Sequence, residues 1–314
     1  EIHERLVGSE MCIRDSFITD GTMTTGNLTS MFSYVMSMMM ALMMLSMIFV
    51  MVSMSAASAR RIAEVLNEKA DITNPENPVM EVPDGRIDFN HVNFTYKKDS
   101  DKDALEDIDI HINAGETIGI IGGTGCGKSS FVNLISRLYD VKDGSVCVGG
   151  IDVRDYDLET LRNEVSVVLQ KNVLFSGTIL DNLRWGDENA TLDEIKEACS
   201  IACVDEFIDR LPGGFDAEMG QEGVNVSGGQ KQRICIARAI LKKPKVLILD
   251  DSTSAVDTAT EGKIKNALAK KLPDMTKIII AQRISSVCQA DQIIIMDGGR
   301  VDAIGTHESL LRTN

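Results

Sequence analysis

The stretch GGTGCGKSS, Gly122 to Ser130, decides the fold predicted for this sequence. It fits the pattern G-x-x-x-x-G-K-[ST] between Gly122 and Ser129, with the apolar run TIGII before it and the helix-like run FVNLISRL after it. Glycines allow backbone N–H groups to curl around phosphate oxygens, and the N-terminus of the following helix adds the positive end of its dipole. The sequence therefore predicts a phosphate-binding loop between a buried strand and a helix.

A second apolar run, KVLIL at 245–249, leads into two acids, Asp250 and Asp251. A buried strand ending here would hold Asp250 against the shell of a metal ion, and the next acid would polarise an attacking water. In the phosphate-binding loop, Lys128 is expected to reach the β- and γ-phosphates and the Ser129 hydroxyl to ligate Mg²⁺. The combination predicts ATP and Mg²⁺ as ligands and ATP hydrolysis as the reaction.

The pattern of the other strands gives the fold class. Five runs are continuously apolar, which is typical of strands buried on both faces of a parallel sheet: 117–121, 165–169, 245–249, 277–281 and 292–296. The runs at 86–96 and 108–112 partly alternate, as strands of an antiparallel layer do. We therefore expect an α/β domain at 86–314 with a RecA-like core, an antiparallel β layer and a helical insert from about Asn172 to Gly220.

The segment NVSGGQKQRICIARAI, Asn225 to Ile240, resembles the signature of the ABC transporter family, with Ser227, Gly228, Gly229 and Gln230 at its core. An N-capped helix alone would explain Ser227 but not the whole segment. The stretch VLFSGTILDNLRWG at 173–186 is similar to the exporter branch of that family. The resemblance extends from about Phe17 to the C-terminus. It implies a head-to-tail dimer in which this signature contacts ATP held by a second half-transporter.

The loop pattern and the resemblance together give the candidate site residues. Tyr96 resembles the aromatic residue of the family that stacks on adenine, and Gln170 resembles a glutamine that contacts Mg²⁺. Asp257 lies in STSAVD, 252–257, which resembles the loop that crosses the dimer interface. The expected ATP-binding residues are Tyr96, Gly122, Gly123, Thr124, Gly125, Cys126, Gly127, Lys128, Ser129 and Ser130, and the expected metal ligands are Ser129, Gln170 and Asp250.

Two catalytic positions, Asp251 and Gln282, differ from the pattern of the family. Asp251 stands where the family has a glutamate, and Gln282 stands where it has a histidine. Shortening the acid by one methylene withdraws its carboxylate by about 1 Å, and misplacement on that scale can cost about a hundredfold in rate. The pair resembles the degenerate-site subunit of a bacterial heterodimeric, multidrug-type exporter, whose own site hydrolyses ATP weakly. A homodimeric exporter with normal hydrolysis and a regulatory ATP-binding module without transport stay open as alternatives.

The N-terminal part is very different in composition, because no charged residue occurs between Asp20 and Arg60. Residues 31–54 are almost all apolar and long enough to cross a membrane as a helix, with a buried soluble helix as the alternative. Arg60 and Arg61 then mark the cytoplasmic side. We expect residues 17–69 to be the end of a transmembrane domain whose earlier helices are missing, and the proline-rich residues 70–85 to be a linker.

These expectations place the chain in a bacterial inner or plasma membrane, in contact with lipid, with the nucleotide-binding domain cytoplasmic and an unknown small molecule as substrate. The net charge of −15 argues against nucleic acid as a partner, and with it against a soluble ABC ATPase that acts on nucleic acid or ribosomes. The seven scattered cysteines indicate reduced thiols and no zinc site. Residues 1–16 have no signal-peptide pattern and are expected to be non-native, with a polar loop as the alternative.

Overall fold

The computed structural model describes residues 19–21, 24–97, 102–220, 223, 225–251 and 255–313. The chain divides into two compact units, Glu1–Asp71 and Ile72–Asn314. The segment 1–16, expected to be non-native, lies outside the described residues, as do Ser252–Ser254 of the expected interface loop.

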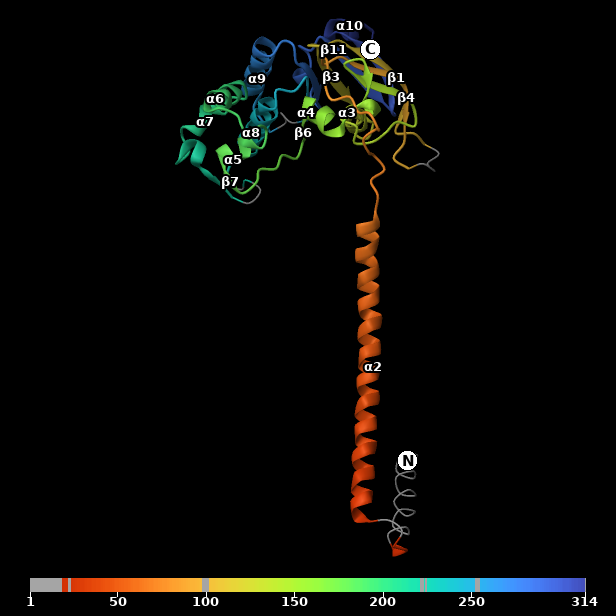
Figure 1. Ribbon diagram of the computed structural model, residues 1–314. Coiled ribbons are helices and arrows are strands. Elements are labelled where there is room, and N and C mark those ends of the chain that lie inside the picture. The colour runs from red at the N-terminus through yellow and green to blue at the C-terminus, as the bar shows by residue number, and fades with distance from the viewer. Residues whose placement is uncertain are drawn as a thin grey trace. The chain divides into compact units, whose positions relative to one another are not determined.

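The first unit contains one long helix, α2, from Thr25 to Asn67 (Figure 1). It begins at Thr24, whose hydroxyl accepts a hydrogen bond from the backbone N–H of Asn27. None of its 43 residues is buried, and its most apolar window has a mean hydropathy of 2.4. The hydroxyl of Ser53 donates to the carbonyl of Phe49, so this polar group is satisfied within the helix itself. By length and composition α2 is able to cross a membrane.

The second unit is built on a six-stranded sheet with the order β12-β11-β3-β10-β9-β6. The strands β11, β3, β10, β9 and β6 are parallel, and each of the five apolar runs in the sequence forms one of these strands. This confirms the predicted fold class. The sixth strand, β12, pairs antiparallel with β11 and was not predicted. The bounds are β3 Thr117–Gly122, β6 Val165–Val168, β9 Val246–Asp250, β10 Thr276–Ile280, β11 Gln292–Asp297 and β12 Arg300–Gly305.

A smaller antiparallel sheet has the order β2-β1-β4-β5. Its first two strands come from the runs in which apolar residues alternate with polar ones, and the burial of β2 alternates in the same way along most of its length. Strands β4 and β5 were missed, because they form a short hairpin around Gly149 and Gly150, which both have positive φ. The bounds are β1 Ile87–Phe94, β2 Leu105–Ile112, β4 Asp143–Val148 and β5 Ile151–Asp152.

The predicted helical insert contains three helices, α5, α6 and α7, and is closed by the short pair β7–β8. Figure 1 shows these elements grouped at one end of the domain, away from β1 and β4. The helices of the domain are α3 Lys128–Ile135, α4 Leu158–Glu164, α5 Ile179–Arg184, α6 Leu192–Ile201, α7 Asp205–Ile208, α8 Gly228–Leu241, α9 Thr258–Lys271 and α10 His307–Thr313, and the short strands are β7 Gly177–Thr178 and β8 Glu218–Met219.

Two hydrophobic clusters fill the domain. One lies between the two sheets and around α3, where the rings of Phe89 and Phe131 stack with centroids 4.1 Å apart. The other joins the helical insert to the remaining face of the large sheet and to α8 and α9. Residues 72–85 carry no helix or strand, but Val79 bridges to Tyr156. The Tyr156 hydroxyl donates to the carbonyl of Val148, and burial raises the pKa of this tyrosine to about 12.

Phe131 joins the helix after the phosphate-binding loop to the antiparallel sheet, and both it and Phe89 are fully buried. We expect Phe131→Ala to lower the free energy of unfolding of the Ile72–Asn314 unit by about 3–5 kcal/mol, because the lost apolar contacts leave a cavity. Leu138→Ala, at a side chain that is 47% exposed, should change it by less than about 0.5 kcal/mol. Denaturant unfolding measures both, and equal costs would contradict the central place given to Phe131.

Candidate functional site

Four loops leave the large sheet at the carboxyl ends of its parallel strands. The phosphate-binding loop begins at the end of β3, and Gln170 follows β6. Asp250 is the last residue of β9 and Asp251 follows it, and Gln282 follows β10. Strand β10 pairs in parallel with both β3 and β9, and β9 pairs in parallel with β6. The carboxyl ends of these strands therefore meet, which is where ligands bind to open α/β sheets.

The backbone of the phosphate-binding loop depends on its glycines. Gly125 and Gly127 have φ of 80° and 101°, values that favour glycine. A side chain at Gly127 would also meet Leu105 Cδ2 at 2.6 Å, whereas one at Gly125 would stand in open space. Gly127, the N-cap residue of α3, provides no side-chain cap, so no cap side chain accepts from the first N–H groups of this helix. The Lys128 ammonium donates to the carbonyls of Gly122 and Gly123, at 2.9 and 2.7 Å.

A cavity of about 560 Å³ lies beside this loop. Tyr96 lines it, with its hydroxyl 2.8 Å from Ser130 Oγ and its ring packed edge-on against Tyr139 at 5.0 Å. Half of Tyr96 is exposed. The structure thus brings the expected adenine-stacking residue to the loop. The sequence analysis missed seven lining residues, of which only the paired glycines gave a visible turn signal: Thr95, Lys97, Lys102, Asp103, Ala104, Gly298 and Gly299.

The two acids at the end of β9 differ in environment. Asp250 is half-buried, and its pKa is raised first by this burial and then by the neighbouring Asp251, while Lys128 acts in the opposite direction. Asp251 has a φ of 46°, which is uncommon for a residue other than glycine. Its backbone N–H donates to the carbonyl of Ile280, at 3.0 Å, so the end of β10 holds it in this conformation.

The carboxylate of Asp251 receives two side-chain amides. Gln170 Nε2 and Gln282 Nε2 each donate to Asp251 Oδ2, both at 2.8 Å. An ionised carboxylate only accepts hydrogen bonds, so each amide must present its nitrogen to it. The amide oxygen of Gln170 is then left for another partner. The structure therefore brings together the two departures from the family pattern and one of the expected metal ligands.

The expected metal ligands Ser129, Gln170 and Asp250 offer a hydroxyl, an amide oxygen and a carboxylate. This set is all oxygen, as Mg²⁺ prefers, so these residues fit the ion. Among the described residues, no group of three or more His, Cys, Asp or Glu side chains is placed to hold a metal.

The signature residues open α8. The Ser227 hydroxyl accepts from the Gln230 N–H at 3.3 Å, and Gln230 Oε1 accepts from the Ser227 N–H at 2.9 Å, which forms a capping box. None of Ser227–Gln230 is among the described residues that line the cavity around Lys128. Asp257 caps α9 by accepting from the Thr260 N–H at 3.0 Å.

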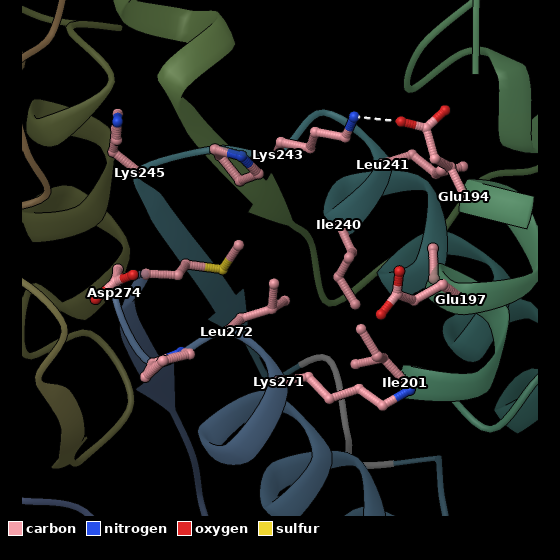
Figure 2. A pocket seen from close by; sticks show the side chains of 14 residues that line it. Glu194, Glu197, Ile201, Ile240, Leu241, Lys243, Lys245, Lys271, Leu272 and Asp274 are labelled. Carbon is pink, nitrogen blue, oxygen red and sulfur yellow. Dashed lines mark hydrogen bonds and ion pairs between the residues drawn. The ribbon is translucent and has the colours of Figure 1, made fainter. Parts of the chain in front are cut away.

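A second hollow, of about 320 Å³, lies at the opposite edge of the sheet, where β9 and β10 begin (Figure 2). Its apolar lining includes Ile240 and Leu272, and Lys243 pairs with Glu194 at 2.5 Å across its rim. This pairing and the cap of α6 lower the pKa of Glu194 to about 2. The hollow contains none of the expected nucleotide-binding residues, so the cavity beside the phosphate-binding loop is the candidate site.

The two signature glycines provide a matched test of close packing. A β-carbon at Gly229 would meet the backbone oxygen of Ala255 at 2.8 Å, whereas one at Gly228 would meet only the Ala255 β-carbon at an ordinary 3.5 Å. We expect Gly229→Ala to destabilise the domain by about 1–3 kcal/mol, because the backbone before α9 must shift. Gly228→Ala should be close to neutral. Thermal unfolding of the two variants checks this, and equal melting temperatures would contradict it.

Comparison with known proteins identifies the domain. The model of the ABC transporter family matches residues 105–254. The putative multidrug export ATP-binding/permease protein YgaD of Bacillus subtilis is 40% identical over 94% of this chain and 51% of its own length. The multidrug resistance protein pgp-1 of Caenorhabditis elegans is 39% identical over 94% of this chain and 22% of its own length.

A solved structure of a bacterial Atm1-family ABC exporter with ATP bound is also similar, with a TM-score of 0.79 and 32% identity over 93% of this chain and 51% of that chain. The chain thus spans about half the length of the bacterial relatives it matches. Residues 105–254 of this chain thus match the ABC transporter family, and the relatives named here include exporters.

Proposed function

We propose that this chain is part of an ATP-driven exporter subunit in a bacterial inner or plasma membrane. Residues 17–69 end its transmembrane domain, residues 70–85 are the linker, and residues 86–314 are a cytoplasmic motor that binds ATP and Mg²⁺. The observation that carries the proposal is the convergence of Lys128, Asp250 and Gln170 at one edge of the sheet, through the pairing of β3, β10, β9 and β6. The apolar helix α2 and the similarity to an ATP-bound exporter support it.

In the proposed ATP site, the cavity beside the phosphate-binding loop takes the nucleotide. Tyr96 stacks on the adenine, and the Lys128 ammonium exchanges its two carbonyl partners for phosphate oxygens. The first N–H groups of α3 add donors and the positive end of the helix dipole. When bound, Mg²⁺ would neutralise phosphate charge, and Ser129, Gln170 and Asp250 would hold it.

The chain's own site is proposed to hydrolyse ATP weakly. A general base has to accept a hydrogen bond from the attacking water, and Asp251 Oδ2 already accepts from the amides of Gln170 and Gln282, which leaves Oδ1 as the more open acceptor. The side chain is also one methylene shorter than a glutamate, which withdraws the carboxylate by about 1 Å. Gln282 cannot become cationic as a histidine can. These features favour a site that holds ATP over one that turns it over rapidly.

The proposed partner is a second half-transporter, in a heterodimer. Ser227 to Gln230 open α8 away from this chain's own cavity, so ATP on another domain is the ligand that this helix end would serve. The signature residues match the family pattern, whereas the chain's own hydrolytic residues depart from it. This combination fits a subunit whose signature completes the hydrolytically competent site of its partner. Lipid would surround α2, and the cargo would be a small molecule, as the names of the multidrug-type relatives suggest.

A homodimeric exporter with normal hydrolysis is the second candidate, because the phosphate-binding loop and the acids are all present. A regulatory ATP-binding module without transport is less favoured, since the similarity to exporters extends over 93% of the chain. A soluble ATPase acting on nucleic acid is disfavoured by the net charge of −15 and by α2.

The test compares the chain in detergent with its double variant Asp251→Glu, Gln282→His. We expect the native chain to bind Mg-ATP but to turn it over slowly, and the double variant to gain about a hundredfold in rate, because the carboxylate then reaches the water. Steady-state phosphate release measures the rate. The control is Lys128→Ala, introduced into both the native chain and the double variant. Because it removes the phosphate contact, loss of phosphate release shows that the measured hydrolysis occurs at this site.

If the native chain, without these substitutions, already hydrolyses ATP rapidly, Asp251 is a working base and the homodimeric exporter is favoured. If neither protein binds Mg-ATP, the proposed function is wrong.

A further inference from the structure

Three loops that are distant in the sequence meet at one oxygen atom. Gln170 lies 81 residues before Asp251 and Gln282 lies 31 residues after it, and both amides donate to Asp251 Oδ2. The main chain of Asp251 is fixed as well, by its positive φ and by its hydrogen bond to the carbonyl of Ile280. The carboxylate is therefore held from β9 and from the end of β10, and it contacts the loop after β6.

A carboxylate can orient an amide, because it accepts hydrogen bonds and donates none. Gln170 must turn Nε2 towards Asp251, and this turns Oε1, the only atom of that side chain able to ligate Mg²⁺, away from it. We propose that Asp251 is a positioning residue: it sets the amide of Gln170 so that its oxygen faces the metal, and Gln282 holds Asp251 in place for this task. The inference rests on the proposed function of the site as one that binds Mg-ATP.

The length of the side chain is the physical reason for this role. Asp251 Oδ2 lies 2.8 Å from both amides, a normal hydrogen-bond distance. A glutamate with the same fixed main chain would carry its carboxylate about 1 Å further and past these partners. The neutral amide of Gln282 adds a second donor without a competing charge. The same substitutions that weaken the acid as a base thus suit it to hold Gln170.

The loop after Gln170 carries its own reporter. Phe175, five residues further on, stacks on Trp185 with ring centroids 4.6 Å apart. Trp185 is the single tryptophan of the chain, and it is 65% exposed. A change in how Gln170 is held should therefore alter the tryptophan fluorescence of the chain, and this readout does not depend on hydrolysis.

The experiment measures binding of a non-hydrolysable ATP analogue to the full chain in detergent, with Mg²⁺ and with EDTA. The ratio of the two dissociation constants gives the gain in affinity that is due to the metal. Asp251→Asn and Asp251→Ala form the matched pair, because both remove the charge but only asparagine keeps an acceptor oxygen at that place. Each is made alone and together with Gln170→Ala, and thermal unfolding without nucleotide checks that the variants fold.

We expect the metal-dependent gain to be about tenfold larger for Asp251→Asn than for Asp251→Ala, since a hydrogen bond to Gln170 is kept in one and lost in the other. Combining either change with Gln170→Ala should abolish the difference. The Mg²⁺-dependent change in Trp185 fluorescence should follow the same order. Equal gains for the two variants, or a difference that persists without Gln170, would overturn the proposal.

Failure of this inference differs from failure of the proposed function. Rapid hydrolysis by the native chain would overturn the proposal that this site turns ATP over slowly. The metal-dependent gain in affinity would still be larger for Asp251→Asn than for Asp251→Ala. Equal metal-dependent gains for those two variants would contradict the positioning role of Asp251, but they would not contradict the proposal of slow turnover. If the native chain shows no metal-dependent gain, both the metal site and this inference are wrong.

Discussion

Parallel pairing of β6, β9, β10 and β3 is the constraint on which the candidate site depends. Hydrogen bonds along these strands fix which residues are level with one another, so Ile280 lies beside both Ile120 and Asp250. The strands are buried on both faces, and a shift of one residue would move each side chain from one hydrophobic cluster into the other. The positions at which the four loops leave the sheet are thus set by the hydrophobic core. The phosphate-binding loop, the acids and the two glutamines inherit their spacing from it.

The two hydrophobic clusters support different parts of the domain. The cluster between the sheets supports α3, where Phe131 packs against Phe89 directly behind the phosphate-binding loop. The other cluster supports the helical insert and α8, which begins with the signature. The two ends that could contact a nucleotide therefore rest on different packed bodies. Such a division suits a motor in which one part of a domain holds its own ATP and another part responds to that of a neighbour.

Asp251 shows how a weaker chemical group can have a structural use. Asp251 joins the loops after β6, β9 and β10, because its carboxylate accepts from two amides and its backbone N–H donates to the carbonyl of Ile280. Freeing Oδ2 for a water would cost both amide hydrogen bonds, and each hydrogen bond to a charged group is worth about 1.5–3 kcal/mol. Under the proposed function, the same arrangement would slow hydrolysis and stabilise metal binding. A chain that pairs with a competent partner would tolerate the first effect and gain from the second.

Local patterns in the sequence were enough to predict most of the fold. The five apolar runs gave the parallel strands, because burial on both faces removes the polar alternation of a surface strand. Glycines followed by Lys128 gave the phosphate-binding loop, since few other residue types allow its backbone. The edge strand β12 and the β4–β5 hairpin were missed, because their pairing depends on neighbours and their runs are short and partly polar.

The meeting of Gln170, Asp251 and Gln282 at a single oxygen was decided by the tertiary structure. Sequence separations of 81 and 31 residues carry no information about distance, which follows from the strand order and the register between strands. The sequence by itself determined which residues are present and which are unusual for the family. Only the fold determined that the unusual acid and the unusual glutamine contact each other and that Gln170 contacts the same oxygen, because hydrogen bonds form between atoms that packing brings within about 3 Å.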